Sequence, residues 1–266
     1  RNIARMALLL AGLPDSVPGV SVNRLCASGM HAVGSAARGI RSGDADLFIA
    51  GGVEGMSRSP FVMAKATAAF SRNAEIYYTT MGWRFVNPKM QQLYGIDEMG
   101  TTAENVAADF KISREDQDLM ALKSQNKAEV AQSNGDLAEE ILAVTIPQRK
   151  CDDIVFDKDE HLRPGSTIEG LEKLRPAFQE GGSVTAGNSS GINDGSCALI
   201  IASEEAANEH GLTPKARILG LAAGGVPPRI MGIGPVPSTK KLMSLISLEM
   251  DDLKRNNSIP YRQRTQ

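Results

Sequence analysis

The chain has 266 residues, which is enough for one large domain or two smaller ones. Its 29 Lys and Arg residues nearly balance 31 Asp and Glu residues, and the formal charge of −2 argues against a general nucleic-acid binder while leaving room for a local phosphate site. No run of about eighteen apolar residues indicates a membrane span. Cys26, Cys151 and Cys197 form no CxxC pair, so we expect no zinc site and no disulfide scaffold, and we expect a reducing compartment.

The first fifty residues predict alternating helices and strands. Residues 2–11 predict a helix that ends at Gly12, and the β-branched residues within 20–22 predict a short strand. Residues 28–41 then carry an apolar face at helical spacing, and residues 46–50 predict a second, buried strand. Strand, helix and strand at this spacing indicate a parallel α/β unit.

The middle of the chain, residues 57–182, differs in texture because it is richer in Met and polar residues. We interpret it as an excursion from the sheet. Within it, Ser113 begins a helix that continues to Val130. After this stretch, strands are predicted at residues 196–202 and 216–222. Helices are predicted at residues 203–210 and from Ser238 onward.

One cysteine lies where a predicted strand turns into a helix. Cys26 follows residues 20–22 and precedes the helix at 28–41, so backbone N–H groups converge there and the helix dipole favours an anion. Such a position favours the thiolate, and the N–H of Cys26 can help to stabilise an oxyanion. On the residues alone, the alternative is a small buried apolar side chain, which is what most lone cysteines are.

Six segments resemble motifs of the thiolase family, in the family's order. They lie at residues 23–29, 50–57, 99–105, 174–178, 185–195 and 231–237. The resemblance extends from residue 2 to about residue 253. It implies the thiolase α/β fold, in αβαβα layers, with a loop domain inserted between two strands and with the fold incomplete at both ends of the chain.

The resemblance also implies a division of the chain. Residues 1–56 and 183–210 correspond to the first core half, and residues 57–182 correspond to the loop domain that binds CoA and substrate. Residues 211–253 correspond to the start of the second core half. The polar residues 254–266 do not match the family, and we expect them to form an atypical, disordered tail.

Thiolases use a cysteine nucleophile, and the resemblance assigns that role to Cys26. An acyl-CoA acylates the cysteine, and the enzyme then cleaves a 3-oxoacyl-CoA with CoA or runs the reverse Claisen condensation. Coenzyme A is a substrate, and the resemblance implies no metal and no permanently bound cofactor. The positions that match the family's CoA side and acyl pocket are Arg163, Phe178, Ala186, Ser190 and Met99. Without the resemblance, Arg163 would be interpreted as a solvated surface arginine, and Phe178 and Met99 as core residues.

A further segment bears on the substrate. Residues 80–88 resemble the 3-oxoadipyl-CoA thiolases of aromatic degradation, which cleave a CoA ester with a distal carboxylate. Arg84 is a candidate partner for that carboxylate, and a surface arginine beside a packed Trp83 is an equal alternative. Glu98 replaces a histidine of short-chain biosynthetic thiolases, which argues against acetoacetyl-CoA synthesis alone. We therefore expect a 3-oxoadipyl-CoA or 3-ketoacyl-CoA acyltransferase.

The chain departs from the family in its acid–base residues. The resemblance implies a histidine before a proline, yet none of His31, His161 and His210 precedes one. Cys151 and Cys197 match no catalytic position, and we expect both to be structural. We therefore expect no turnover from this chain by itself. Two alternatives stay open: a catalytically inactive, truncated CoA-binding fragment, and another condensing enzyme of the same fold such as a ketoacyl synthase, against which the long insert argues.

The resemblance also implies partners and a compartment. It predicts acyl-CoA and CoA as small-molecule partners, a homodimer or homotetramer for the complete protein, and neither nucleic acid nor membrane. The chain begins at Arg1 without a methionine, so we expect its true termini to be missing. The expected location is the cytoplasm of a bacterium, or the mitochondria or peroxisomes of a eukaryote.

Overall fold

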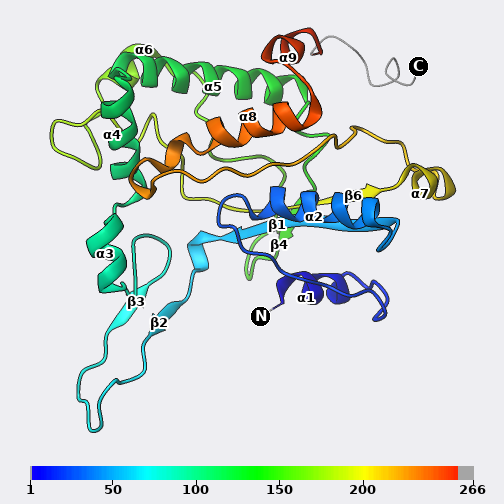
Figure 1. Cartoon of the computed structure of the whole chain (residues 1–266), viewed down its shortest axis with the longest axis horizontal. Helices are drawn as coiled ribbons and strands as arrows, with labels where there is room; N and C mark the ends of the chain where they lie inside the picture. The colour runs from blue at the N-terminus through cyan, green and yellow to red at the C-terminus, as the bar shows by residue number, and fades with distance from the viewer. Residues whose placement is uncertain (1, 257–266) are drawn as a thin grey trace. The chain divides into compact units, whose positions relative to one another are not determined.

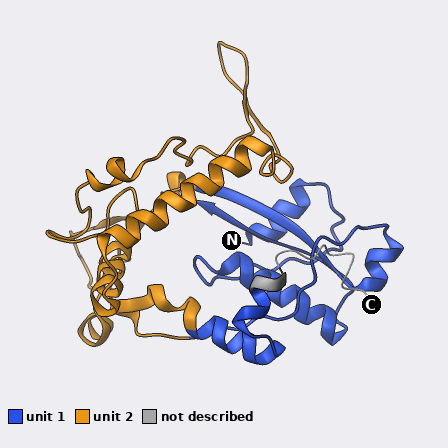
Figure 2. Ribbon diagram, turned by 90° about the horizontal axis from the view of Figure 1, so that it is seen from above, with its two compact units in different colours: residues 1–55, 194–224, 237–266 blue, residues 56–193, 225–236 orange. Residues whose placement is uncertain are grey.

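The computed structural model describes residues 2–256, with side chains as far as residue 253. The chain divides into two compact units, shown in blue and orange in Figure 2. Unit 1 consists of Arg1–Gly55, Asp194–Gly224 and Pro237–Gln266. Unit 2 consists of Met56–Asn193 and Gly225–Val236. Of the predicted tail, residues 254–256 belong to a helix (Met250–Asn256), so the disorder expected of them is wrong, and residues 257–266 lie outside the described residues. The assignment of the family's domains to the chain stays a prediction.

An antiparallel ribbon lies at the centre of unit 1. Strand β1 (Leu47–Gly55) pairs with β6 (Asp194–Ala202), and Ala50 is opposite Leu199 in the register. Helix α2 (Ser28–Ser42) packs against both strands (Figure 1). The strands predicted at 46–50 and 196–202 and the helix at 28–41 are therefore confirmed, with β1 extending further than the sequence indicated. The burial expected of the strand at 46–50 is wrong, because Ala50 is the one buried residue of β1.

Small residues let α2 approach the ribbon closely. A Cβ on Gly39 would lie 2.8 Å from the end of the Phe48 ring, so the ring occupies space that a larger side chain would need. The helix ends at Gly43, which is in the left-handed conformation with φ of 79° and caps the last turn. The buried residues of the helix are Gly34, Ala36, Ala37 and Gly39.

Four further helices belong wholly or mostly to unit 1. They are α1 (Ile3–Leu10), α7 (Glu204–Glu209), α8 (Pro235–Ile246) and α9 (Met250–Asn256). The helices predicted at residues 2–11 and 203–210 are confirmed, and α8 begins at Pro235, ahead of the predicted Ser238. Met243 of α8 contributes to the buried apolar core of this unit.

The strand predicted at residues 20–22 is wrong, because these residues lie outside any strand. The segment before them bonds to α1 instead of to a sheet. The Asn2 side chain donates to the carbonyl of Gly19 at 2.7 Å, and the Arg5 guanidinium donates to the carbonyl of Asp15 at 2.7 Å. A short β-branched run forms a strand only where a neighbouring strand is available to pair with it.

The strand predicted at residues 216–222 is also wrong. This segment has no ladder partner within the described residues, and the Arg41 guanidinium donates to the carbonyls of Ile218 and Leu219 at 2.7 and 3.2 Å. The predicted parallel α/β unit is wrong as well, because residues 20–22, which were expected to form its first strand, lie outside any strand. Within the described residues β1 pairs with β6 alone, and the pairing is antiparallel.

Unit 2 is built from helices and two small hairpins. Its helices are α3 (Pro88–Tyr94), α4 (Met99–Phe110), α5 (Arg114–Asn134) and α6 (Ile168–Glu172), with the 3₁₀ turns η1 (Met56–Arg58) and η2 (Pro228–Ile233). The hairpins pair β2 (Phe61–Met63) with β3 (Ile76–Tyr78), and β4 (Val144–Ile146) with β5 (Ile154–Phe156). α4 packs against η2, and α5 packs against α6 (Figure 1).

Helix α5 begins where the sequence predicts. The hydroxyl of Ser113 accepts a hydrogen bond from the backbone N–H of Asp116 at 3.0 Å, which satisfies one free donor of the first turn. The helix continues past the predicted Val130 and ends at Gly135, which has φ of 83°. No helix in the described part of the chain is long and apolar enough to cross a bilayer.

We expect Ser113→Ala to lower the free energy of unfolding by about 1 kcal/mol, because the N–H of Asp116 loses its capping acceptor. Urea denaturation followed by circular dichroism measures the change. Ser124→Ala is the matched control, since Ser124 is exposed within the same helix and alanine there gains up to about 0.5 kcal/mol of helix propensity. Equal midpoints for the two variants would show that the cap contributes nothing.

Candidate active site

Cys26 lies on an exposed turn just ahead of α2 in unit 1. Two side chains hold the turn. The Asn23 side-chain oxygen accepts from the N–H of Leu25 at 2.9 Å. The Ser28 hydroxyl accepts from the N–H of Arg24 at 2.8 Å and donates to the carbonyl of Leu25 at 2.6 Å. Because the thiol is exposed, Cys26 is not the buried apolar side chain that was the alternative.

The backbone around Cys26 is also constrained. Leu25 has φ of 50°, a left-handed conformation that is uncommon for a residue with a side chain and often marks a functional turn. Gly29, in the first turn of α2, lies against β1 so closely that a Cβ on Gly52 would be 3.4 Å from its Cα. The helix half of the predicted strand-to-helix setting is therefore confirmed, while the strand half is wrong.

The other two cysteines are exposed as well. Cys151 lies in the loop that joins β4 and β5, and Cys197 lies in β6 opposite Gly52. Neither is buried in a core as a structural cysteine would be. Exposure alone therefore does not distinguish Cys26, whereas its place at the N-terminus of a fifteen-residue helix does. Within residues 2–256, no group of three or more His, Cys, Asp and Glu side chains could hold a metal ion.

Three of the predicted CoA-side residues come from adjoining segments of unit 2. Pro176 forms an antiparallel bridge with Thr185, so the segment that carries Phe178 runs beside the one that carries Ala186 and Ser190. Ala186 and Ser190 are exposed, and Phe178 is 39% exposed. The structure therefore leaves all three accessible to a ligand of this unit.

The predicted acyl-pocket residue Met99 lies beside Phe178. Met99 is the first residue of α4 and is 62% exposed. The next residue, Gly100, is covered by the aromatic ring, since a Cβ there would lie 2.0 Å from Cγ of Phe178. Gly100 therefore allows the ring to lie directly on the first turn of α4, which brings the two predicted residues together.

Arg84 belongs to a turn that contacts the same end of α4. The indole N–H of Trp83 donates to the carbonyl of Asp97 at 3.4 Å, and a Cβ on Gly82 would lie 3.7 Å from a carboxylate oxygen of Glu98. The Arg84 guanidinium is exposed and donates to the carbonyl of Gly82 at 3.0 Å. Trp83 is 52% exposed, so the packed tryptophan of the alternative interpretation is wrong.

Arg163 turns its side chain back onto its own loop. Its Nη1 donates to the carbonyls of Glu160, His161 and Leu162 at 2.8, 3.2 and 3.1 Å. Its backbone N–H donates to the side-chain oxygen of Gln125 on α5 at 2.9 Å. The residue is exposed, but these bonds orient the guanidinium toward the protein backbone, and a phosphate would compete with them.

Sequence reasoning gave no role to Glu104, although it lies in one of the quoted segments. Its buried carboxylate, on α4, accepts from the backbone N–H groups of Ser183 and Val184 at 2.9 and 2.8 Å, and from the Ser183 hydroxyl at 3.0 Å. No sequence pattern links Glu104 to Ser183 and Val184, which follow it by 79 and 80 positions. The sequence therefore could not predict the hydrogen bonds by which Glu104 fixes the segment that begins at Ser183.

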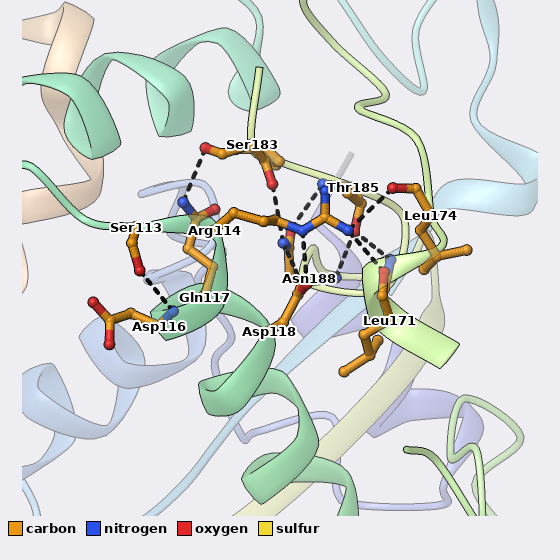
Figure 3. A network of polar contacts seen from close by, with 12 residues as sticks. Ser113, Arg114, Asp116, Gln117, Asp118, Leu171, Leu174, Ser183, Thr185 and Asn188 are labelled. Atoms are coloured by element: carbon orange, nitrogen blue, oxygen red, sulfur yellow. Dashed lines mark hydrogen bonds and ion pairs between the residues drawn. The ribbon is translucent and has the colours of Figure 1, made fainter. Parts of the chain in front are cut away.

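Asp118 was also missed. It is fully buried on α5, where one oxygen accepts from Nε of Arg114 at 2.7 Å and the other from Nδ2 of Asn188 at 2.9 Å (Figure 3). The Arg114 guanidinium also donates to the carbonyls of Leu171 and Leu174 at 2.7 and 3.0 Å. The i,i+4 spacing of the two charged residues was a usable signal for the ion pair, though not for its third partner.

A second ion pair ties η2 to α4. Nη1 of Arg229 lies 2.5 Å from Oδ2 of Asp109, and this hydrogen bond and the negative charge raise the pKa of Arg229 above its ordinary value. The Asn105 side chain donates both to the carbonyl of Arg229 and to the carboxylate of Asp97, each at 2.9 Å. The ion pair itself is exposed and stabilises little. Together these contacts hold η2, in which the family-like segment of residues 231–237 begins, against α4.

Comparison with known proteins identifies the class. A family profile described as "Thiolase, N-terminal domain" matches residues 1–205, so the chain belongs to the thiolase family. The chain is 58% identical over 252 residues to the beta-ketoadipyl-CoA thiolase of Pseudomonas putida, a match that covers 95% of this chain and 63% of that protein. It is 57% identical over 253 residues to the 3-oxoadipyl-CoA/3-oxo-5,6-dehydrosuberyl-CoA thiolase of Escherichia coli K12, with the same coverage of 95% and 63%.

A solved structure agrees with this assignment. The crystal structure of the Bacillus anthracis acetyl-CoA acetyltransferase matches with a TM-score of 0.82 at 41% identity, covering 94% of this chain and 62% of that one. The predicted thiolase α/β fold is thereby confirmed. The chain spans less than two thirds of the length of each of these three proteins.

We expect Gly100→Ala to destabilise unit 2 by about 1–3 kcal/mol, because the new methyl group overlaps the Phe178 ring. The measurement is the urea midpoint. In a Phe178→Ala background the same glycine substitution should cost nothing, since the ring is gone and alanine favours the helix. A penalty of equal size in both backgrounds would mean that Phe178 does not lie on the first turn of α4.

Proposed function

We propose that the protein is an acyl-CoA C-acyltransferase in which Cys26 accepts the acyl group. The observation that carries the proposal is an exposed cysteine on a constrained turn at a helix N-terminus, inside a segment that resembles the family's nucleophile motif. The Cys26 thiolate attacks the thioester carbonyl carbon, the bond between that carbon and the CoA sulfur breaks, and the CoA thiolate leaves and is protonated. The product of this half-reaction is an acyl-cysteine thioester.

The second half-reaction returns the acyl group to a CoA sulfur or joins it to the α-carbon of another thioester. In the cleavage direction, Cys26 is acylated when it attacks the 3-oxo carbon: the bond between that carbon and the α-carbon breaks, acetyl-CoA departs, and the acyl group left on Cys26 then passes to the sulfur of free CoA. The α-carbon of the departing group takes a proton, which requires a positioned acid. The helix N-terminus at α2 favours the negative charge that develops on the oxygen of the attacked carbonyl group, which supports Cys26 over Cys151 and Cys197.

We assign the CoA contacts to unit 2. Ser190 and Ala186 are exposed on one loop beside Phe178, and Phe178 covers the first turn of α4 next to Met99. A serine hydroxyl suits the polar pantetheine arm, and the apolar side chains suit its alkyl portions. Arg163 stays a proposed nucleotide contact, which requires that its guanidinium exchange some of its bonds to backbone carbonyls for phosphate.

The proposed substrate is 3-oxoadipyl-CoA or another 3-oxoacyl-CoA with a distal carboxylate. Two relatives with 58% and 57% identity are named for such substrates. Arg84 supplies an exposed cation on a turn that contacts the residues just before Met99, which supports it as the proposed partner of the distal carboxylate. The location proposed is the bacterial cytoplasm, since both relatives are bacterial.

A second candidate function is CoA binding without turnover. It is favoured by the three histidines, because none of them precedes a proline as the family's base does. We propose, on the same resemblance, that the loop domain of residues 57–182 contributes to the CoA site together with Ala186 and Ser190, and that a complete protein forms a homodimer or homotetramer. Repeated turnover of a 3-oxoacyl-CoA by the chain would exclude this candidate, and a single acylation event would support it.

We expect the chain to form one acyl adduct with acetyl-CoA, at Cys26, because this thiol alone among the three lies at a helix N-terminus. Intact-mass spectrometry with peptide mapping measures it. Cys26→Ala should abolish the adduct, and the control Cys151→Ala should leave it unchanged. An adduct that maps to Cys151 or Cys197 would refute the assignment of the nucleophile.

We expect Arg84→Met to weaken binding of succinyl-CoA about two- to fivefold, because an exposed arginine–carboxylate pair contributes modestly. Butyryl-CoA is the matched ligand, since its acyl chain has the same length without the distal charge, and its affinity should not change. Calorimetry measures both. Arg72→Met, which removes another cation of the same unit, is the control variant. Equal losses for both ligands would show that Arg84 does not recognise a distal carboxylate.

A further inference from the structure

The loop at residues 183–190 is closed by its own polar groups. The N–H of Thr185 donates to the side-chain oxygen of Asn188 at 2.7 Å. In return, the Thr185 hydroxyl accepts from the N–H groups of Gly187 and Asn188 at 3.2 and 3.3 Å. Within the loop, Thr185 is fully buried, whereas the next residue, Ala186, is exposed. The shape of the loop therefore depends on how the Asn188 side chain is oriented.

Asp118 sets that orientation from outside the loop. Nδ2 of Asn188 donates to Oδ1 of Asp118 at 2.9 Å and to the carbonyl of Ser183 at 3.1 Å (Figure 3). The amide is thereby held with its oxygen toward the N–H of Thr185. Oδ2 of Asp118 is already occupied by Nε of Arg114 at 2.7 Å. The buried carboxylate thus serves two donors with two separate oxygens, which an amide in its place cannot do, since it has a single acceptor oxygen.

Glu104 fixes the other end of the same loop. Its carboxylate accepts from the N–H groups of Ser183 and Val184, and it lies so close to the chain that a Cβ on Gly182 would be 2.3 Å from Oε1. The Gln117 side chain on α5 also donates to the Ser183 hydroxyl at 2.9 Å. Two helices therefore clamp the loop at its first residues and at Asn188, while the exposed Ala186 lies between these points.

We propose that Asp118 and Glu104 are positioning residues for CoA: they hold the loop of residues 183–190 in the conformation that presents Ala186 and Ser190 to the ligand. The inference rests on the proposed CoA role of these two positions. Neither carboxylate touches the ligand. Each acts by orienting backbone or amide groups of the loop, so their loss should lower CoA affinity through loop disorder.

Buried polar groups of this kind fix one geometry because any other leaves them unpaired. A buried acceptor or donor without a partner is costly, so alternative loop conformations that separate Asn188 from Asp118 are disfavoured. Apolar packing alone does not distinguish the two orientations of the Asn188 amide. Removal of the Asp118 charge should therefore release the loop more than it weakens α5, which keeps its Ser113 cap and its contact with α6.

The test uses the whole chain of 266 residues with Asp118→Asn. Asp116→Asn is the matched control, because it makes the same chemical change at an exposed position one half-turn earlier on α5. The exchange variant Asp118→Asn/Asn188→Asp restores a donor–acceptor pair between the two side chains and leaves an oxygen for Arg114. Asn188→Ala is a milder fourth variant, which keeps the test decisive if Asp118→Asn does not fold.

Two readouts are needed. Hydrogen–deuterium exchange of the peptide that spans residues 183–190 reports the loop directly, and calorimetry with CoA reports its consequence. We expect Asp118→Asn to speed loop exchange and to raise the CoA dissociation constant about tenfold, the scale of one or two lost buried hydrogen bonds. Asp116→Asn should change neither, and the exchange variant should recover part of both, which a general loss of stability would not produce.

Unchanged loop exchange in Asp118→Asn and Asn188→Ala would overturn the proposed clamp. Faster exchange with unchanged CoA affinity would overturn the link between the clamp and CoA, while the proposed function would stand. If the parent chain itself does not bind CoA, the CoA role of Ala186 and Ser190 fails and the inference about CoA fails with it. In that case loop exchange still decides whether Asp118 holds the loop, so the two failures are distinguishable.

Discussion

Two buried carboxylates set the conformation of the second unit, because Glu104 and Asp118 join helices α4 and α5 to a loop that no sheet supports. Buried charges persist only where hydrogen-bond donors surround them, and here the donors belong mostly to the loop and to Arg114. The chain therefore has little freedom between residues 182 and 188. The exposed side chains of Ala186 and Ser190 are therefore carried on a backbone of defined conformation, which a binding surface on a loop requires.

In unit 1, close packing of backbone against backbone or ring takes the place of buried charges. The ribbon and helix approach each other through glycine, at Gly39 beneath the Phe48 ring and at Gly29 against Gly52. At Gly39 the Phe48 ring leaves no room for a Cβ, whereas Gly29 and Gly52 bring the helix and strand backbones into ordinary van der Waals contact. They place the first turn of α2, and hence the turn at Cys26, against the β1 backbone. The candidate nucleophile is thus fixed by close packing, whereas the candidate CoA loop is fixed by charge.

This difference explains what the sequence could and could not predict. Helices α1, α2, α5 and α7 were predictable because their caps and periodicity lie within one segment, as with Ser113 and Gly135 at the ends of α5. The strands at residues 20–22 and 216–222 were not, since pairing depends on a distant partner and both segments bond to asparagine or arginine side chains instead, Ser21 to Asn2 and Ile218 to Arg41. Cys26 was proposed as the nucleophile from its local motif, whereas the contact between Asp118 and Asn188 joins residues seventy positions apart and had no local signal.

Two parts of the proposed activity depend on different segments of the chain. The proposed acylation of Cys26 depends on the turn and the helix N-terminus formed by residues 23–42. The proposed binding of CoA depends on a loop whose geometry is assembled from α4, α5 and residues 183–190. Small changes anywhere in that second set can therefore alter ligand affinity while leaving the nucleophile intact. Substitutions that weaken CoA binding without touching a ligand atom are then expected far from the cysteine in sequence, at the buried ends of the clamp.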